Sequence, residues 1–152
     1  MATVLDLRTA VHPLERIANR VAARGVDILR VSLGLVIVGF GVLKFFPGVS
    51  PAQPLVTHAV DMLTFGVVSG QAAMVATATV ECFVGLTLVT GRLLRLGVLL
   101  LAGCVLGWMS PLVLFPGDLF ANGGPTLAAQ YILKDIVLGA AGLVVAIKAF
   151  KE

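Results

Sequence analysis

Apolar residues fill four long stretches of this chain, and polar residues gather in the segments between them. The four stretches cover about 28–46, 71–90, 96–117 and 127–149. Each is long enough to cross a bilayer as a helix, which takes roughly 20 residues. Backbone polar groups must pair internally in lipid, so a crossing segment is predicted to be helical. The pattern predicts an all-α protein, a four-helix transmembrane bundle, with a kink at Pro111 in the third helix.

The segment before the first stretch has a different pattern. Arg16, Arg20 and Arg24 recur at every fourth residue, and apolar residues repeat at helical spacing beside them. This pattern favours an N-terminal amphipathic interfacial helix, anchored by its arginines to an anionic membrane surface. The alternative is an ordinary solvated face beside a membrane span. Gly25 is expected to end this helix before the first crossing.

Composition supports a membrane protein and one compact unit. Of the 152 residues, 59% are hydrophobic and 12% are charged, whereas soluble domains are about 25% charged. The length allows an N-terminal segment at 1–25 and a single transmembrane domain at 26–152. Basic residues are few and are not interleaved with aromatic ones, so nucleic acid is not an expected partner.

The placement of basic residues predicts the orientation in the membrane. Lysines and arginines lie before the first stretch, between the second and third, and after the fourth, whereas the connections 47–70 and 116–126 hold none. The positive-inside rule then places both termini in the cytoplasm. Within the first outer connection, residues 55–69 are moderately hydrophobic. They could form an interfacial helix, a re-entrant segment or an early start to the second crossing.

Charged residues inside the apolar stretches are the candidate site. Lys44 lies near the outer end of the first stretch, Glu81 in the middle of the second, and Lys134 and Asp135 within the fourth. A rise of about 1.5 Å per residue places all four in the outer half of the bilayer. A charge at membrane depth costs about 2.5–3.5 kcal/mol, so these residues are expected to form a neutral, paired cluster.

Three roles remain open for this four-charge cluster. It could consist of structural ion pairs that fix the helix register. It could bind a quinone head group or another small molecule from the outer side, or it could relay protons.

Other polar and aromatic residues in the stretches have simpler expected roles. Arg30, at the inner end of the first stretch, is expected to extend to the head groups as an anchor. Trp108 and Tyr131 are expected to be interfacial lipid anchors. Cys82 and Cys104 are interpreted as small packing residues, with a redox pair as the alternative if their helices touch. The sequence holds no catalytic motif and no metal or haem spacing.

Three helix motifs of this chain resemble those of the DoxX-like family of integral membrane proteins. The segments 29–34 and 41–47 are similar to that family's first-helix pattern. Residues 81–85, followed by Gly91-Arg92, are similar to its second-helix motif, and residues 134–138 are similar to the start of its last-helix motif. The Pro-rich connection after the first helix resembles the branch associated with reactive-chlorine resistance. The resemblance implies a four-helix bundle, and its motifs include Arg30, Lys44, Glu81, Lys134 and Asp135.

Some relatives in that family are the membrane subunit of thiosulfate:quinone oxidoreductase, and others associate with redox-stress enzymes. The expected function is therefore a non-catalytic accessory subunit of a redox or respiratory complex in the bacterial cytoplasmic membrane. Such a subunit would have no intrinsic cofactor, and its partners would be the lipid bilayer and other membrane-protein subunits. The alternatives are a quinone-interacting oxidoreductase subunit, whose polar site lies in the outer half of the bundle, and a small-molecule transporter.

Overall fold

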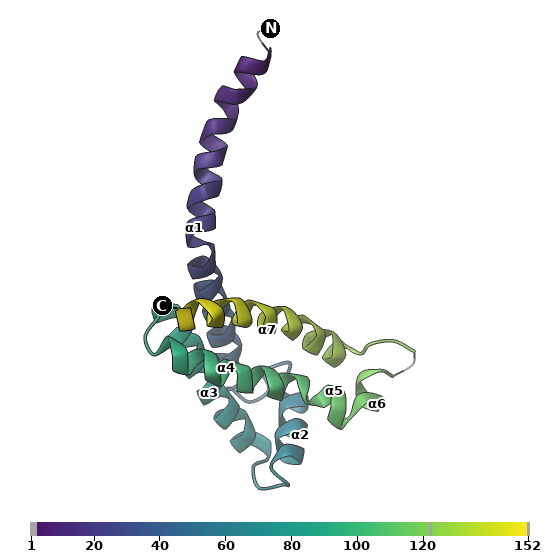
Figure 1. Cartoon of the computed structure of the whole chain (residues 1–152). Coiled ribbons are helices and arrows are strands. Elements are labelled where there is room, and N and C mark those ends of the chain that lie inside the picture. The colour runs from purple at the N-terminus through teal and green to yellow at the C-terminus, as the bar shows by residue number, and fades with distance from the viewer. Residues whose placement is uncertain (1–2, 122, 152) are drawn as a thin grey trace.

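The computed structural model describes residues 3–121 and 123–151, and before Arg24 it describes side chains only at Ile17 and Val21. All regular secondary structure in the described residues is helical (Figure 1). The helices are α1 (Thr3–Leu43), α2 (Gln53–Leu63), α3 (Gly70–Thr90), α4 (Leu94–Met109), α5 (Pro111–Leu114), α6 (Pro116–Leu119) and α7 (Leu127–Lys151). The all-α fold class is confirmed, and α1, α3, α4 and α7 are the long helices of the bundle.

Three segments of the described chain are long and apolar enough to cross a membrane. The first is Arg24–Leu43, the second half of α1, and the second is Gly70–Thr90, the whole of α3. The third is Leu94–Leu114, which comprises α4 and α5. The predicted fourth crossing, α7, is not one of these three. It has 25 residues, a length of about 37 Å, and it packs along α4 and against α1.

The expected helix break at Gly25 is wrong. α1 runs without interruption from Thr3 to Leu43, because a glycine inside a helix costs only about 1 kcal/mol relative to alanine and does not by itself end the helix. Arg24 is exposed. The side chains of Arg16 and Arg20 lie outside the described residues, so their membrane-anchoring role stays a prediction.

The connection between the first two crossings contains a separate short helix. α1 ends at Leu43, and turns at residues 44–52 lead into α2. A second turn separates α2 from α3, where Phe65 and Gly66 both have positive φ. Residues 55–69 are therefore not an early start to the second crossing. α2 packs against α3 and α5.

Glycines set the distance between α1 and α3. A Cβ placed on Gly34 would lie 2.7 Å from the carbonyl oxygen of Gly85, and one placed on Gly85 would lie 2.7 Å from the carbonyl oxygen of Gly34. The two backbones therefore touch, as small residues permit in membrane helices. Beside this contact, a core of buried side chains joins α1, α3, α4 and α7, among them Leu33, Ile37 and Leu88.

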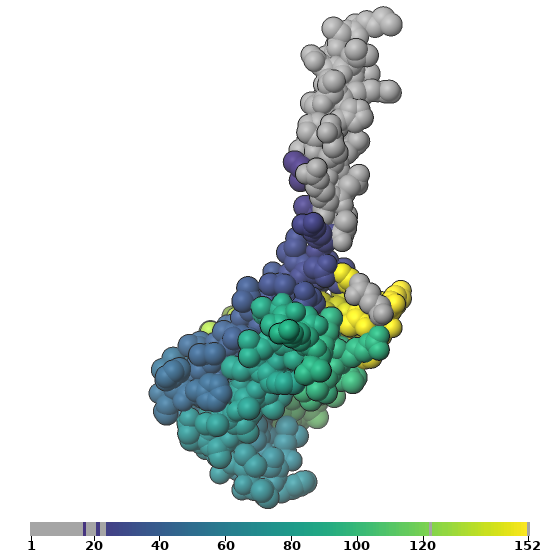
Figure 2. Space-filling model, turned by 90° about the vertical axis from the view of Figure 1, so that its left-hand side faces the viewer, coloured from purple at the N-terminus to yellow at the C-terminus, as the bar shows by residue number. Residues whose placement is uncertain are grey.

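Polar contacts join the helices at one end of the bundle, which we call the base and define by Asp27, Arg30, Arg95 and Lys148. Lys148 Nζ lies 2.8 Å from Asp27 Oδ1. The Arg95 guanidinium donates to the Ala149 carbonyl at the end of α7, at 3.2 Å. Figure 2 shows the yellow end of α7 beside the purple part of α1 at this level.

Arg30 differs from its expected role as a head-group anchor. Its guanidinium donates to the carbonyls of Leu88 and Val89, in the last turn of α3, and its side chain is only 17% exposed. The last carbonyls of a helix have no intrahelical partner and carry the negative end of the helix dipole, so they attract a nearby cation. Arg30 thus caps α3 from the neighbouring helix.

We predict opposite effects for the same substitution at two glycines of α1. Gly34→Ala should destabilise the protein by about 1–3 kcal/mol, because the new methyl group would meet the α3 backbone. Gly39→Ala should be neutral or stabilising by about 0.5–1 kcal/mol, since a Cβ there meets nothing within 4 Å. Unfolding by SDS titration, followed by circular dichroism, measures both. Equal effects at the two positions would contradict the close backbone contact.

Candidate functional site

A buried ion pair lies where α1 ends inside the bundle. Lys44 directly follows the last residue of α1, and its Nζ lies 2.5 Å from Oε2 of Glu81, midway along α3. The Lys44 side chain is 7% exposed and that of Glu81 is 2% exposed. The C-terminal end of a helix carries partial negative charge, which also favours a cation at this position.

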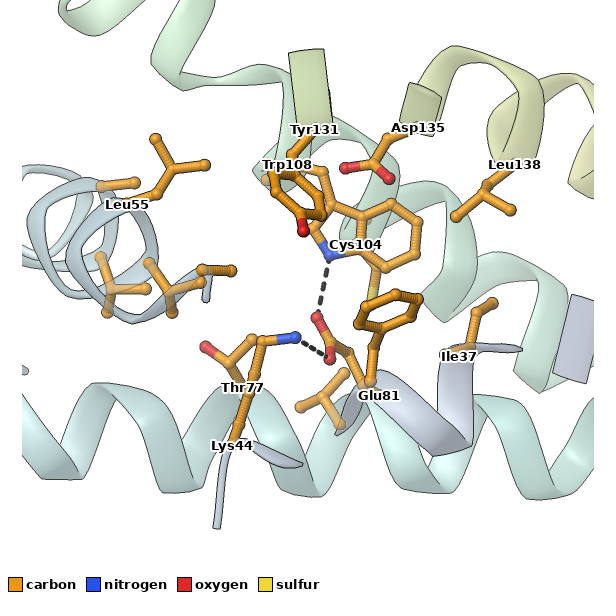
Figure 3. Close-up of a pocket in the computed structure, with 18 of the residues that line it drawn as sticks. Ile37, Lys44, Leu55, Thr77, Glu81, Cys104, Trp108, Tyr131, Asp135 and Leu138 are labelled. Atoms are coloured by element: carbon orange, nitrogen blue, oxygen red, sulfur yellow. Dashed lines mark hydrogen bonds and ion pairs between the residues drawn. The ribbon is translucent and has the colours of Figure 1, made fainter. Parts of the chain in front are cut away.

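The second carboxylate oxygen of Glu81 is also bonded. The Trp108 indole Nε1 donates to Glu81 Oε1 at 2.9 Å, so Lys44 and Trp108 together satisfy both oxygens (Figure 3). The expectation that Trp108 is an interfacial lipid anchor is therefore wrong. A buried carboxylate needs hydrogen-bond donors as well as a counterion, and Trp108 supplies one from α4.

Lys134 and Asp135 lie apart from this ion pair. Lys134 is exposed, and its Nζ sits 4.0 Å from the centroid of the Tyr131 ring, in a cation–π contact. Asp135 is partly buried on the same helix. Within the described part of the chain, neither residue forms an ion pair with Lys44 or Glu81. The structure brings together two members of the four-charge cluster and places the other two across a cavity from them.

That cavity has a volume of about 850 Å³ and is lined by α1, α2, α3, α4, α5 and α7. Its walls are mostly aliphatic and aromatic side chains. Its polar lining comes from Lys44, Thr77, Glu81, Cys104, Trp108, Tyr131, Lys134 and Asp135. In Figure 3 the carboxylate of Asp135 points into the space that Glu81 and Trp108 also face.

Three features of the site were not found by the sequence analysis. α2 supplies one wall of the cavity, including Leu55 and Ala59. Gly103 and Gly107 leave part of the α4 wall empty, because a Cβ at either would meet nothing within 4 Å. The partner of Glu81 could have been narrowed to a few residues, because an antiparallel hairpin that turns at 91–93 brings residues 103–107 level with 77–81, and Trp108 comes directly after them.

The cysteines occupy different surroundings. Both are free. Cys104 lines the cavity, whereas the sulfur of Cys82 would lie 3.0 Å from a Cβ placed on Gly41 in α1. Among the residues that the structure describes, no three His, Cys, Asp or Glu side chains gather closely enough to hold a metal ion.

A protein-family model covers most of this site. The DoxX model matches residues 25–115, which include Lys44, Glu81 and Trp108 but not Lys134 or Asp135. This match confirms the resemblance found in the sequence. No curated protein and no solved structure gives a significant match to the chain.

We predict that breaking the ion pair from one side costs more than removing both charges. Lys44→Met leaves the Glu81 carboxylate buried without its counterion and should destabilise the protein by about 3–5 kcal/mol. Adding Glu81→Gln should recover much of that loss, because the neutral amide oxygen still accepts the Trp108 N–H. SDS unfolding followed by circular dichroism measures each variant.

The matched control for this series is Lys151→Met, which removes an exposed lysine and should change stability by less than about 0.5 kcal/mol. If Lys44→Met behaves like this control, or if the double variant is less stable than the single one, the ion pair does not contribute as described.

Proposed function

This chain belongs to the DoxX family of integral membrane proteins, and from this premise we propose that it is a quinone-interacting membrane subunit of a redox complex. The observation that carries the proposal is the position of the Lys44–Glu81 pair, which faces a cavity of about 850 Å³. Both residues line this cavity although their side chains are only 7% and 2% exposed. Small-molecule sites are typically about 300–1,000 Å³, mostly apolar, with few convergent polar groups.

The polar groups around the cavity match the hydrogen-bonding needs of a quinone head group. Quinone carbonyl oxygens accept hydrogen bonds, and the Lys44 ammonium has three N–H donors, of which one is directed to Glu81. The hydroxyl groups of the reduced form would instead donate to a carboxylate such as Glu81 or Asp135. The rings of Trp108 and Tyr131 also line the cavity and offer faces for stacking.

The orientation that the basic residues predict is part of this proposal. With both termini in the cytoplasm, the base of the bundle lies at the inner surface. The cavity then lies toward the outer leaflet, beyond the level of Ile37 and Leu101 in the core.

A non-catalytic accessory role is the second candidate, and it is favoured by the length of α1. The helix has 41 residues, whereas its crossing part is Arg24–Leu43. The remainder, about 30 Å at the usual rise, projects away from the bundle (Figure 1). A helix that extends in this way offers another subunit a surface to bind. This role and quinone binding do not exclude each other.

We predict that a short-chain benzoquinone quenches the fluorescence of the purified protein in a saturable manner. Trp108 is the single tryptophan and lines the cavity, so the signal reports on this site alone. Gly103→Leu should weaken binding by about tenfold or more, because the new side chain occupies space that the quinone needs. Titration in detergent, with inner-filter correction, measures the affinity.

Gly39→Leu is the control for this titration, since Gly39 is exposed and does not line the cavity. It should leave the affinity unchanged. The absence of saturable quenching in the unmodified protein, or equal weakening by the two substitutions, would contradict the quinone site.

A further inference from the structure

Exposed residues line the cavity on α1 and on α7, and they point to an opening between these two helices. Four of its lining residues define this opening, which we call the mouth: Val36 and Phe40 on α1, and Lys134 and Val137 on α7. Phe40 is 48% exposed and Val137 is 69% exposed, although both belong to the cavity wall. Nearer the base, α1 and α7 are joined by the core around Leu33 and by the Lys148–Asp27 pair.

The two ends of the cavity are closed by packed side chains. Toward the base lies the core that includes Ile37, Val84 and Leu101. At the opposite end, a second core is formed by Leu119, Ala129 and Ile132, with Leu55, Met109, Leu112 and Ala128 packed against it. These residues come from α2, α4, α5, α6 and α7. His58 of α2 also stacks on Phe115, with ring centroids 4.4 Å apart, so the end nearer the outer loops is covered.

The seam between α3 and α4 differs from the mouth. Val80 and Leu99 are exposed lining residues on this side. At the level of the cavity, however, the hydrogen bond from Trp108 to Glu81 joins these two helices. In the described residues no hydrogen bond or ion pair joins α1 to α7 at this level.

The predicted crossing of the membrane by α7 places the mouth at the depth of lipid acyl chains. Val137 is ten residues into α7, which is about 15 Å along the helix, or half of a hydrocarbon core about 30 Å thick. Its apolar members therefore face lipid rather than water. A ligand that passes here must already be dissolved in the bilayer.

We propose that the cavity is filled sideways from the membrane, and that its ligand is a quinone with a long apolar tail. The ring lies at the Lys44–Glu81 pair, and the first part of the tail lies in the mouth between Phe40 and Val137 and continues into the lipid. The identity of the head group rests on the proposed function, whereas the lateral opening rests on the exposed lining residues and on the predicted crossing of α7. The second core lies toward the outer loops, so we expect the ligand to enter from the membrane rather than from water on the outer side.

The opening can be tested without any quinone. The protein is reconstituted in phosphatidylcholine vesicles whose acyl chains are brominated at mid-chain, and the quenching of Trp108 fluorescence is measured. Acyl chains that enter the mouth quench the indole. Val137→Phe narrows the mouth and should reduce this quenching by about half or more, since the added ring occupies the volume of several methylene groups. Iodide added to the outside should quench little.

Val144→Phe is the matched control, because Val144 lies two turns along the same face of α7, is 45% exposed and does not line the cavity. It should not change the quenching by brominated lipid. Strong quenching by iodide with little by brominated lipid would overturn the proposal, as would equal effects of the two substitutions. A second copy of the chain bound over the mouth would also abolish quenching by brominated lipid, and this result too would overturn the proposal.

The tail is tested by comparing two quinones with the same ring. Val137→Phe should weaken binding of an isoprenoid-tailed quinone by about tenfold, which corresponds to the loss of roughly two buried methylene groups. The affinity for the tail-less quinone should not change. An unchanged affinity for the tailed quinone overturns the placement of the tail. If neither quinone binds but brominated lipid still quenches through the mouth, the proposed function fails and the lateral opening stands.

Discussion

Lys44 lies directly after the end of α1, inside the bundle, and the rest of the site follows from that position. Its ammonium is buried, so it needs an anion within contact distance, and Glu81 on α3 provides one. Glu81 in turn needs a second donor, which Trp108 supplies from α4. One buried charge thus links three helices at the level where the first of them ends.

The cavity lies beside the end of α1, since Lys44 is one of its lining residues. After Lys44, turns at 44–52 lead to α2, a separate helix that packs against α3 and α5. α2, α4 and α7 border the same cavity, and Gly103 and Gly107 add room on the α4 side.

Hydropathy predicted the helices well because it reflects a simple constraint, the burial of apolar segments in lipid. The second crossing was predicted at 71–90 and α3 begins at Gly70. The same count placed Lys44 and Glu81 in the same half of the bilayer. It could not place them around the helix axes, and for that reason Lys134 was expected to join the pair. Lys134 instead lies over the Tyr131 ring, on a helix whose rotation is set by packing with α4.

Arg30 and Trp108 were misinterpreted for a related reason. Both residue types are common at membrane surfaces, where a long or amphipathic side chain reaches the head groups. That rule applies to residues without a closer partner. Here a partner is present in each case, but it lies on another helix: the last carbonyls of α3 for Arg30 and the Glu81 carboxylate for Trp108. Such pairs depend on the tertiary arrangement and leave no periodic signal in the sequence.

The structural and functional interpretations of the ion pair can be weighed against each other on energetic grounds. Replacing a buried pair by apolar residues is often neutral or stabilising, so stability alone does not require one. Register does not require it either, because the Gly34–Gly85 contact and the capping of α3 by Arg30 already fix α1 on α3. What the apolar alternatives could not provide is a cation and an anion among the residues that line the cavity. This is the ground on which the proposed function assigns the pair to a ligand.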